Sequence, residues 1–506
     1  MKKALMFCIG MLSTSILLAQ DVTDAVRYSM DEIQGTARFR AMGGAFGALG
    51  GDMSAVNINP AGSAIFNTSH ASLTLGYFDK QDDITYFNGV NTASNSNVDV
   101  NQLGAAFVFA NNNPNSPWKR FTLSAAFDRV ADFDDDWIAS GVNPNTSIVE
   151  YFFAFADGQR LDEISAFPGE TISQAYSEIG RFFGFGNQQA FLGYEGFIID
   201  PVSNTDDNTE YIRNISGSDF DQTFAYTSRG YNGKMAFNFA TNYDDKFYFG
   251  VNLNAHFINF ERTTFFSESN SNASSTVTNV NFDNNLLTTG SGFSFQLGGI
   301  AKLTEEFRVG LSYNSPTWYR ISEETSQFLA TTRLENGSSV NQIVNPNVTN
   351  IFPDYRLQTP GKITGSLAYV FGRTGLLSFD YSVKDYANAQ FRPTSDVFFS
   401  ALNGEINNTL TSASSYRFGG EYRYKQLSFR GGYRFEESPY QDNTFFGDLT
   451  GYSLGLGYTF GSFNLDLAFS QSERDINYQF FNVGLTDSAL LQSKFTDIVL
   501  SLGFRI

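Results

Sequence analysis

Apolar and polar residues alternate with a period of two along most of this chain. Residues 247–257 read FYFGVNLNAHF, and residues 121–128 and 376–386 repeat the same alternation. A period of two is the spacing of side chains that share one face of a β-strand. The pattern therefore predicts a protein built mainly from strands.

About fourteen strands can be predicted, at residues 70–80, 101–110, 119–130, 231–243, 246–263, 290–302, 305–320, 355–371, 375–392, 413–424, 425–438, 449–460, 462–477 and 495–506. Short polar turns, such as GRTG after Phe371, alternate with much longer connections. Short turns at one end and long loops at the other are typical of outer-membrane barrels. We therefore expect an all-β fold, a transmembrane antiparallel up-and-down β-barrel of about 14 strands, formed by residues 70–506.

The N-terminal sequence MKKALMFCIGMLSTSILLAQ has the features of a secretory signal peptide. Lys2 and Lys3 precede an apolar core, and Ala19 offers a small residue for cleavage. We expect residues 1–20 to be removed on export. Cys8 is the only cysteine of the chain, so we expect the mature protein to contain no disulfide and no cysteine-ligated metal.

One long connection, residues 131–230, is predicted to be helical in part. Ile148, Tyr151 and Phe155 follow helical spacing, and Ile172 and Ile179 belong to a second such run. We expect a helical insertion in a long extracellular loop. It either packs on itself, offers an apolar landing surface for a hydrophobic ligand, or binds a protein partner.

Composition narrows the possible functions. Aromatic residues make up 16% of the chain, more than a soluble exported protein needs, and the formal net charge of -19 argues against nucleic acid as a partner. His70 and His256 are the only histidines, and no catalytic or metal-ligand spacing is found. We expect no enzyme activity, no cofactor and no metal site. The run DFDDDW at residues 132–137 is interpreted as a solvated loop, with a divalent-cation site as the alternative.

A small-residue segment, residues 41–66, fits neither a helix nor a strand pattern. Its glycines permit tight turns and close approach to a wall, and they are Gly43, Gly44, Gly47, Gly50 and Gly51. Pro60 fixes its own backbone and favours an extended Asn59. The Asn59 side chain is then free to bond to nearby backbone.

This segment resembles the N-terminal plug motif of the FadL/TodX family of outer-membrane transporters for long-chain fatty acids and other hydrophobic compounds. That motif is a small-residue run followed by Asp-x-Ser-x-x-x-x-Asn-Pro-Ala-Gly and then the first strand. The matching residues are Asp52, Ser54, Asn59, Pro60, Ala61 and Gly62. Residues 359–371, TPGKITGSLAYVF, also resemble part of a late strand pair of that family.

The resemblance implies that residues 21–69 fold inside the lumen as a hatch. It implies that a hydrophobic ligand, fatty-acid-like or aromatic, binds at the outer loops, enters the lumen and leaves sideways into the membrane beside a kinked strand. No energy-coupling motif is visible near the mature N-terminus, so we expect passive uptake by a monomer in contact with outer-membrane lipids. The alternative is a related barrel that serves as a surface binding protein or in secretion-associated assembly.

Charged residues of the late strands are expected to face the lumen, because they alternate with apolar positions. They are Asp380, Lys384, Arg417, Glu421, Arg423, Arg430 and Arg434, with Arg38 and Arg40 of the hatch as further candidates. One interpretation is a structural network that holds the hatch. The other is that one or two arginines bind the anionic head of a ligand, since arginine can hold a carboxylate through two hydrogen bonds.

Overall fold

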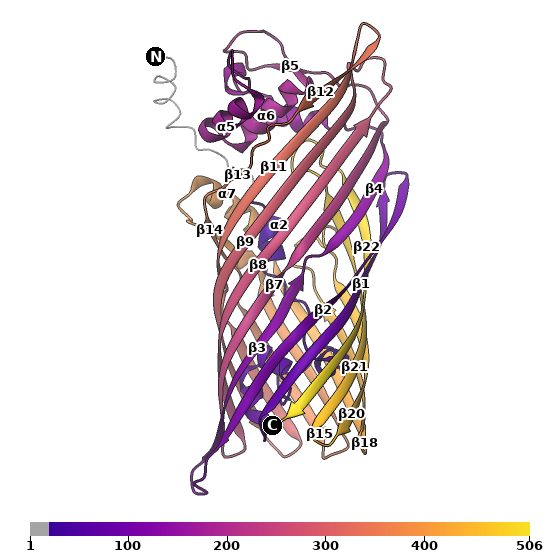
Figure 1. Cartoon of the computed structure of the whole chain (residues 1–506). Helices are drawn as coiled ribbons and strands as arrows, with labels where there is room; N and C mark the ends of the chain where they lie inside the picture. The colour runs from indigo at the N-terminus through magenta and orange to yellow at the C-terminus, as the bar shows by residue number, and fades with distance from the viewer. Residues whose placement is uncertain (1–19) are drawn as a thin grey trace.

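The structure is a computed structural model that describes residues 20–506. The predicted signal peptide, including Cys8, lies outside the described residues apart from Gln20. Fourteen antiparallel strands form a closed barrel, with the C-terminus at the end that carries the short turns (Figure 1). Pairing of the first strand with the last, for example Leu73 with Leu502, closes the wall. The predicted strand number and fold class are confirmed.

In order around the wall, the barrel strands are β1 (His70–Tyr86), β2 (Gly89–Ala110), β3 (Trp118–Asp132), β7 (Phe220–Tyr243), β8 (Phe247–Ser269), β9 (Val277–Lys302), β10 (Phe307–Asn314), β15 (Lys362–Phe371), β16 (Gly375–Asp385), β18 (Ser412–Tyr424), β19 (Leu427–Glu436), β20 (Leu449–Phe460), β21 (Phe463–Gln479) and β22 (Ser488–Arg505).

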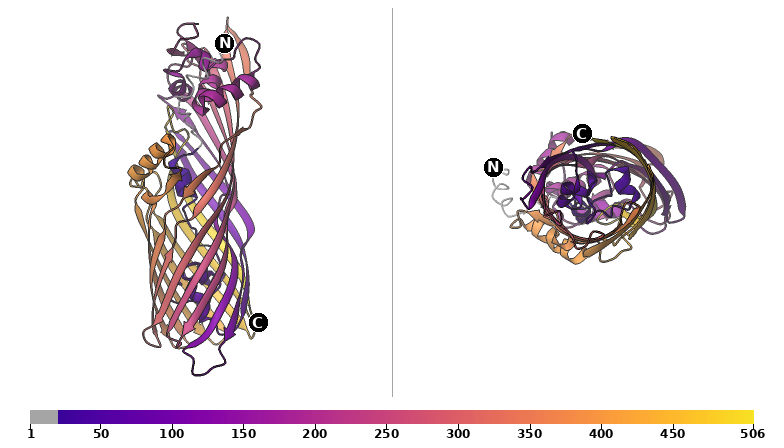
Figure 2. Two further views of the ribbon diagram at one scale, coloured as in Figure 1. Left: turned by 90° about the vertical axis from the view of Figure 1, so that its left-hand side faces the viewer. Right: turned by 90° about the horizontal axis from the view of Figure 1, so that it is seen from below.

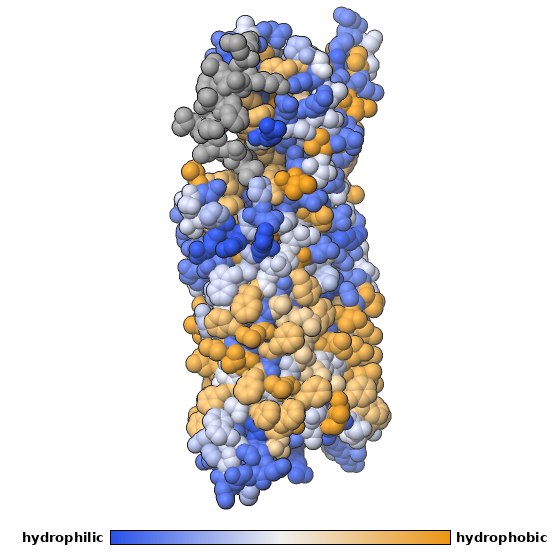
Figure 3. All heavy atoms as spheres, turned by 60° about the vertical axis from the view of Figure 1, so that its left-hand side comes forward, coloured by the Kyte–Doolittle hydropathy of each residue, from blue (hydrophilic) through white to orange (hydrophobic). Residues whose placement is uncertain are grey.

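On the face drawn in Figure 3, an apolar band covers the lower half of the barrel. Outward side chains such as Phe249, Leu253 and Leu454 are at least half exposed, as expected for a lipid-facing surface. Trp118 and Trp318 are each the first residue of a strand, and interfacial aromatic residues are common at strand ends. No helix within residues 20–506 is long and apolar enough to cross a membrane.

Several strands extend well beyond the predicted ends. We expected a long outer connection between residues 80 and 101, but β1 and β2 continue to a tight turn in which Tyr86 pairs with Gly89. The prediction was wrong because residues 90–100, VNTASNSNVDV, carry mostly small polar side chains and lack a clear apolar face. Above the membrane neither face of the hairpin meets lipid, so the alternation disappears.

Two predicted strands are each divided in two. The stretch predicted at 305–320 becomes β10 and β11 (Trp318–Glu335), interrupted at Pro316, and the stretch at 355–371 becomes β14 (Tyr355–Gln358) and β15, interrupted at Pro360. Proline has no amide hydrogen to donate to a strand ladder. The remaining upper elements are β12 (Ser338–Val344), β13 (Asn350–Ile351), the short helix η4 (Tyr386–Asn388), β17 (Gln390–Arg392) and the unpredicted helix α7 (Val397–Thr409).

The insertion at residues 131–230 forms a cap over the upper end of the barrel (Figure 1). It contains β4 (Asp135–Asn143), α4 (Val149–Ala156), η3 (Leu161–Glu163), α5 (Ile172–Phe183), α6 (Phe185–Glu195), β5 (Ile199–Pro201) and β6 (Tyr211–Arg213). The two predicted helical runs correspond to α4 and α5, whereas α6 was not predicted.

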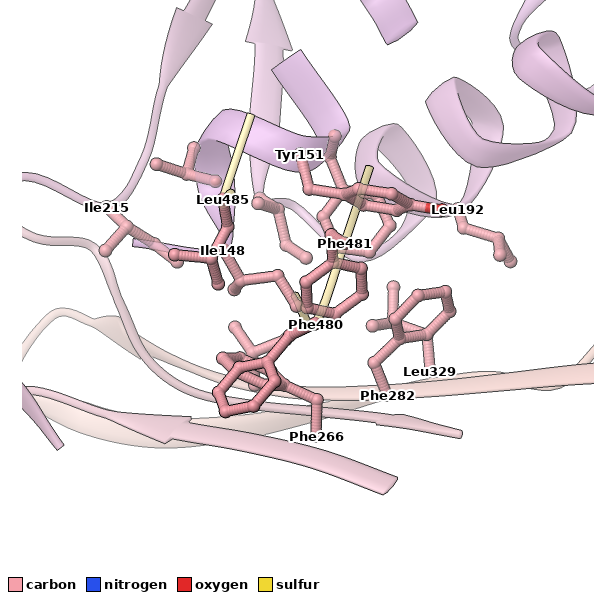
Figure 4. Packing of buried hydrophobic residues seen from close by; sticks show 14 of the residues in the cluster. Ile148, Tyr151, Leu192, Ile215, Phe266, Phe282, Leu329, Phe480, Phe481 and Leu485 are labelled. Atoms are coloured by element: carbon pink, nitrogen blue, oxygen red, sulfur yellow. The ribbon is translucent and has the colours of Figure 1, made fainter. Parts of the chain in front are cut away.

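A buried apolar cluster joins the cap to the strand tops (Figure 4). Phe480 and Phe481, in the connection between β21 and β22, lie at its centre. The Phe480 ring stacks on Phe224 of β7 at 4.3 Å between centroids. Phe481 contacts Tyr151 of α4 and Phe282 of β9. The cap is therefore a packed part of the barrel and not a free loop.

Residues 20–69, here called the N-terminal segment, lie inside the barrel (Figure 2, right). The segment contains α2 (Val22–Arg27), α3 (Ala37–Ala41), η1 (Ser54–Asn57) and η2 (Pro60–Ile65). All are short, and most of their residues are buried against the inner wall.

Candidate functional site in the barrel lumen

The Asn-Pro-Ala-Gly turn of the N-terminal segment is bonded to the wall formed by β7 to β10. Asn59 Nδ2 donates to the carbonyls of Gly47 at 2.8 Å and of Gly299 at 3.0 Å. Its Oδ1 accepts from the amide of Ala61 at 3.1 Å and so caps η2. Asn238 of β7 donates to the Pro60 carbonyl at 2.9 Å. The turn is thus fixed from both sides.

Glycines in the wall make this close approach possible. A Cβ at Gly250 would lie 2.3 Å from the carbonyl carbon of Pro60, and one at Gly298 would lie 2.0 Å from Asn59 Oδ1. A Cβ at Gly310 would lie 2.3 Å from the Gly47 carbonyl oxygen. Sequence reasoning missed these wall glycines. They could have been found, because the alternation of each strand places these glycines on the face that lines the lumen.

The remaining motif residues hold the segment to itself. Asp52 Oδ1 accepts from Thr36 Oγ1 at 2.7 Å and from the Ser54 amide at 3.0 Å, while the Gly51 amide donates to the Gly62 carbonyl at 2.9 Å. Four of the predicted glycines have positive φ: Gly43, Gly44, Gly50 and Gly51. Gly47 instead packs against the wall, where a Cβ would meet Ser366 Oγ at 1.9 Å.

Most of the predicted charged residues fall into two groups, the first of which surrounds Glu421. This buried carboxylate pairs with Arg38 at 2.9 Å, with Arg430 at 2.6 Å and with Arg423 at 2.5 Å. Arg430 also pairs with Asp466 at 2.6 Å. We call this set the lower network. It links the N-terminal segment to β18, β19 and β21.

Two further residues, which do not belong to the lower network, also hold the N-terminal segment in place. Asp380 Oδ2 accepts from the amides of Phe46 and Gly47, both at 3.0 Å. Arg40 pairs with Asp497 of β22. These contacts place the segment against strands on several sides of the lumen.

The second group surrounds Glu436 and carries more positive than negative charge. Glu436 accepts from Arg417 at 3.3 Å and lies 3.8 Å from Arg434, which also donates to Ser472 at 2.9 Å. Arg474, only 6% exposed, makes no ion pair with any residue from 20 to 506. Its guanidinium lies 4.3 Å from the Phe446 ring centre, and its Nε has no acceptor. We call Arg417, Arg434, Arg474 and Glu436 the upper cluster.

Lysines extend this positive region toward α2. Lys362 and Lys384 both contact Asp31, at 2.8 Å and 3.4 Å, and Lys384 also donates to the Ser29 carbonyl. Sequence reasoning missed Arg474, Lys362 and Asp31. Alternation along β21 and β15 could have revealed the first two, whereas nothing in the pattern distinguished Asp31.

An apolar cluster lies beside these cations, with α2 as one of its components. Val22, Val26 and Tyr28 of the N-terminal segment pack with inward side chains of the barrel and of α7, including Phe260 and Phe399. The upper lumen therefore combines apolar walls with excess positive charge.

The wall is split between β2 and β3 above the apolar band. Their pairing ends where Gln102 meets Asp128, although β2 continues upward on β1. On the other side of the split, β3 shifts register between Arg129 and Ala131 and stays on β7. Outward apolar side chains border the opening on β2, where Val98 is 72% exposed.

Residues 31–35 of the N-terminal segment fill this split. The Glu32 amide donates to the Val130 carbonyl at 3.0 Å. Gln34 Oε1 and the Gly35 amide both bond to the Asn101 side chain. The wall is thus completed by a few polar contacts instead of a strand ladder.

The two histidines and the acidic run have structural partners. His256 Nε2 lies 2.8 Å from Ser294 Oγ, and His70 stacks on Phe66. In the acidic run, Asp132 pairs with Arg129 and Asp135 with Lys80. Within residues 20–506, no cluster of three or more histidine, aspartate or glutamate side chains could hold a metal ion.

A family profile described as outer membrane protein transport protein (OMPP1/FadL/TodX) matches residues 197–478. The match covers more than half of the chain, so the protein belongs to this family of outer-membrane transport proteins. Its location is therefore the outer membrane of a Gram-negative cell. A search of curated proteins by sequence gave no match.

Solved structures share the fold. A Pseudomonas aeruginosa FadL homologue is 12% identical, with a TM-score of 0.56 over 94% of this chain and 99% of that one. The Pseudomonas putida toluene transporter TodX is 12% identical, with a TM-score of 0.52 over 94% of this chain and 100% of that one. At these identities the likeness shows a common architecture.

Proposed function

We propose that this protein takes up hydrophobic small molecules, fatty-acid-like or aromatic, by passive diffusion through the barrel lumen. The observation that carries the proposal is Arg474, a buried cation that makes no ion pair with a carboxylate of residues 20–506, in a part of the lumen that combines apolar walls with excess positive charge. An unpaired buried charge lowers stability. Its presence here supports a ligand that brings an anionic head and an apolar body.

The N-terminal segment supports the same ligand class. Helix α2 packs its apolar side chains into the upper lumen, and Asp31 a few residues later lies between Lys362 and Lys384. An apolar body followed by a carboxylate has the composition of a fatty acid. A ligand of this kind would replace α2 and Asp31 without leaving the lysines unpaired.

We further propose that the ligand leaves sideways through the split between β2 and β3. Val98 and Val100 offer an apolar surface on the outside of the split. The polar bonds of residues 31–35 are each worth about 1 kcal/mol, so this part of the segment can move while the Asn-Pro-Ala-Gly turn stays in place. Residues 21–69 then act as a hatch that opens at one edge.

Cross-linking tests the position of the exit. Because the mature chain is expected to lack cysteine, Gln34→Cys with Asn101→Cys gives a unique pair across the split, to be joined by a short thiol-reactive cross-linker. We expect the joined pair to take up a radiolabelled long-chain fatty acid at least about tenfold more slowly than the reduced protein, because a covalent tie blocks an opening that polar bonds alone permit.

A second pair provides the matched control. Ser63→Cys with Asn238→Cys ties the other end of the segment to β7, where the two side chains already bond at 2.5 Å. We expect this tie to leave uptake unchanged. Equal slowing by both ties would mean that the whole segment must leave, and no slowing by either would rule out an exit at the split.

A further inference from the structure

A polar groove lies on the outer face of the wall, above the apolar band. It has a volume of about 480 Å³ and is formed by β8, β9 and β11 together with the loop between β12 and β13. Its polar lining includes Thr263, Asp283, Asn285, Ser326 and Asn347, and Phe328 supplies an aromatic ring. Most of these strand side chains face outward, because they alternate with inward residues such as Phe282 and Leu329. The inward residue Gln327 also lines the groove.

Asp283 is the most informative group in the groove. Its side chain is partly buried, yet it makes no hydrogen bond and no ion pair with any other residue of the stretch 20–506. Neighbouring groups do find partners: Thr263 Oγ1 donates to Asn285 Oδ1 at 2.8 Å. A carboxylate that is partly desolvated and left without a donor is ready to accept hydrogen bonds from a ligand.

The loop that borders the groove is held in place by the cap. Ser173 of α5 donates to the Pro346 carbonyl, and the side-chain amides of Gln188 and Asn350 bond to each other at 3.0 and 3.1 Å. Asn347 has a φ of 49°, fixed by a bond from its amide to Asn345 Oδ1. The groove is thus formed before any ligand arrives, which lowers the entropic cost of binding.

The chemistry of the lining selects the ligand class. Amides, hydroxyls and a single carboxylate suit a neutral molecule with many hydroxyl groups. A single carboxylate is too few for a dedicated divalent-cation site, and the polar lining does not suit the apolar molecules proposed for the lumen. The Phe328 ring can pack against the apolar face of a sugar ring.

We propose that this groove binds a saccharide unit, with Asp283 as the acceptor for ligand hydroxyls. Asp283 lies ten residues along β9 beyond Phe293, which is 47% exposed and belongs to the lipid-facing surface. At about 3.3 Å per residue and a tilt near 40°, the groove lies roughly 25 Å above that residue. Sugars linked to outer-leaflet lipid and soluble glycans both reach this height.

The test uses full-length protein in detergent micelles. The probes are a neutral O-antigen oligosaccharide released from lipopolysaccharide and an array of soluble neutral oligosaccharides, followed by calorimetric titration of any glycan that binds. We expect Asp283→Asn to weaken binding at least about tenfold, since a hydrogen bond to a charged group is replaced by one to a neutral amide. Binding of the O-antigen oligosaccharide alone identifies the source as the membrane itself, and binding of soluble glycans identifies an external source.

Two further variants separate a binding effect from a folding effect. Glu261→Gln removes an exposed outward carboxylate of β8 outside the groove and should leave the affinity unchanged. Thr349→Trp should fill the groove and abolish binding without a change of charge. Failure of every probe to bind, or equal binding by wild type, Asp283→Asn and Thr349→Trp, would overturn the proposal.

Discussion

The lower network and the upper cluster lie in the same lumen and on the same strands, yet they differ in how their charges are paired. In the lower network, Glu421 meets three arginines, and Arg430 gains a second carboxylate from Asp466. In the upper cluster, Glu436 is the only carboxylate paired with Arg417 and Arg434, and Arg474 has none within the described part of the chain. An arginine that faces the lumen therefore does not by itself indicate either a structural or a ligand-binding role in this barrel.

This difference in charge pairing follows from what fills the lower and the upper part of the lumen. The N-terminal segment packs tightly against the lower wall, and the charges of the lower network all find partners in the protein. The upper lumen combines α2 and apolar side chains with the upper cluster, whose arginines outnumber its one carboxylate. This excess positive charge is available to a ligand. Complete pairing indicates a structural role, whereas incomplete pairing at a stability cost indicates a binding site.

The largest expected effect comes from filling the space between the wall and the Asn-Pro-Ala-Gly turn. Gly250→Val places a side chain where a Cβ alone would lie 2.3 Å from Pro60. Because backbone lies on both sides, we expect the N-terminal segment to lose about 3 kcal/mol or more of docking free energy. Amide hydrogen exchange in residues 54–65 measures the loss directly.

Gly365→Val is the matched control, because a Cβ at Gly365 of β15 meets no atom within 4 Å. It adds the same side chain to another barrel glycine and should leave the exchange of residues 54–65 unchanged. Unaltered protection in Gly250→Val would show that the segment does not need this close fit.

The sequence predicted those elements that keep the same environment on one face along their whole length. Membrane-facing strands alternate because lipid contacts one side along their whole length. Helices α4 and α5 bury one face and so keep helical spacing, as at Tyr151 and Ile179. The Asn59 turn was visible because proline fixes its own φ and glycine permits backbone conformations that other residues avoid.

Features that depend on several distant segments could not be predicted. The split between β2 and β3 involves a bulge at Asn101, a register shift after Arg129 and contacts from Glu32, which are far apart in sequence. Alternation along β19 assigned Arg430 to the lumen, but the pairing of Arg430 with Asp466 depends on the register of two further strands. A one-dimensional pattern contains no register, so it could not separate the lower network from the upper cluster.

An intermediate effect is expected when one arginine of each group is replaced. Arg474→Gln removes the unpaired cation, and we expect the affinity for a long-chain fatty acid to fall by about ten- to a hundredfold, since a charge-assisted hydrogen bond is lost. Thermal stability should be unchanged or slightly higher. Arg430→Gln should instead lower stability by about 2–4 kcal/mol, because it leaves the buried Asp466 unpaired and removes one of the three arginines from Glu421.

Two readouts keep these variants distinct. Arg474→Lys retains the positive charge and should recover part of the fatty-acid affinity, and binding of a neutral fatty alcohol should be the same in Arg474→Gln and wild type. A larger loss of stability in Arg474→Gln than in Arg430→Gln would reverse the roles assigned to the two groups.

The smallest expected effect is a pH dependence of α2, the element that occupies the upper lumen. Burial, followed by the charge of Asp21, raises the pKa of Asp24 to about 6, although Arg27 acts in the opposite direction. The pKa in docked α2 is then above the ordinary value of 3.8, so docked α2 takes up a proton first and docking strengthens as the pH falls. Between about pH 7 and about pH 5 the docking free energy of α2 improves by about 1 kcal/mol.

Amide hydrogen exchange of residues 22–28 measures this effect. At each pH, the protection in wild type is divided by the protection in Asp24→Asn, and this ratio should increase as the pH falls. A ratio that does not change with pH would mean that α2 docks independently of the Asp24 charge.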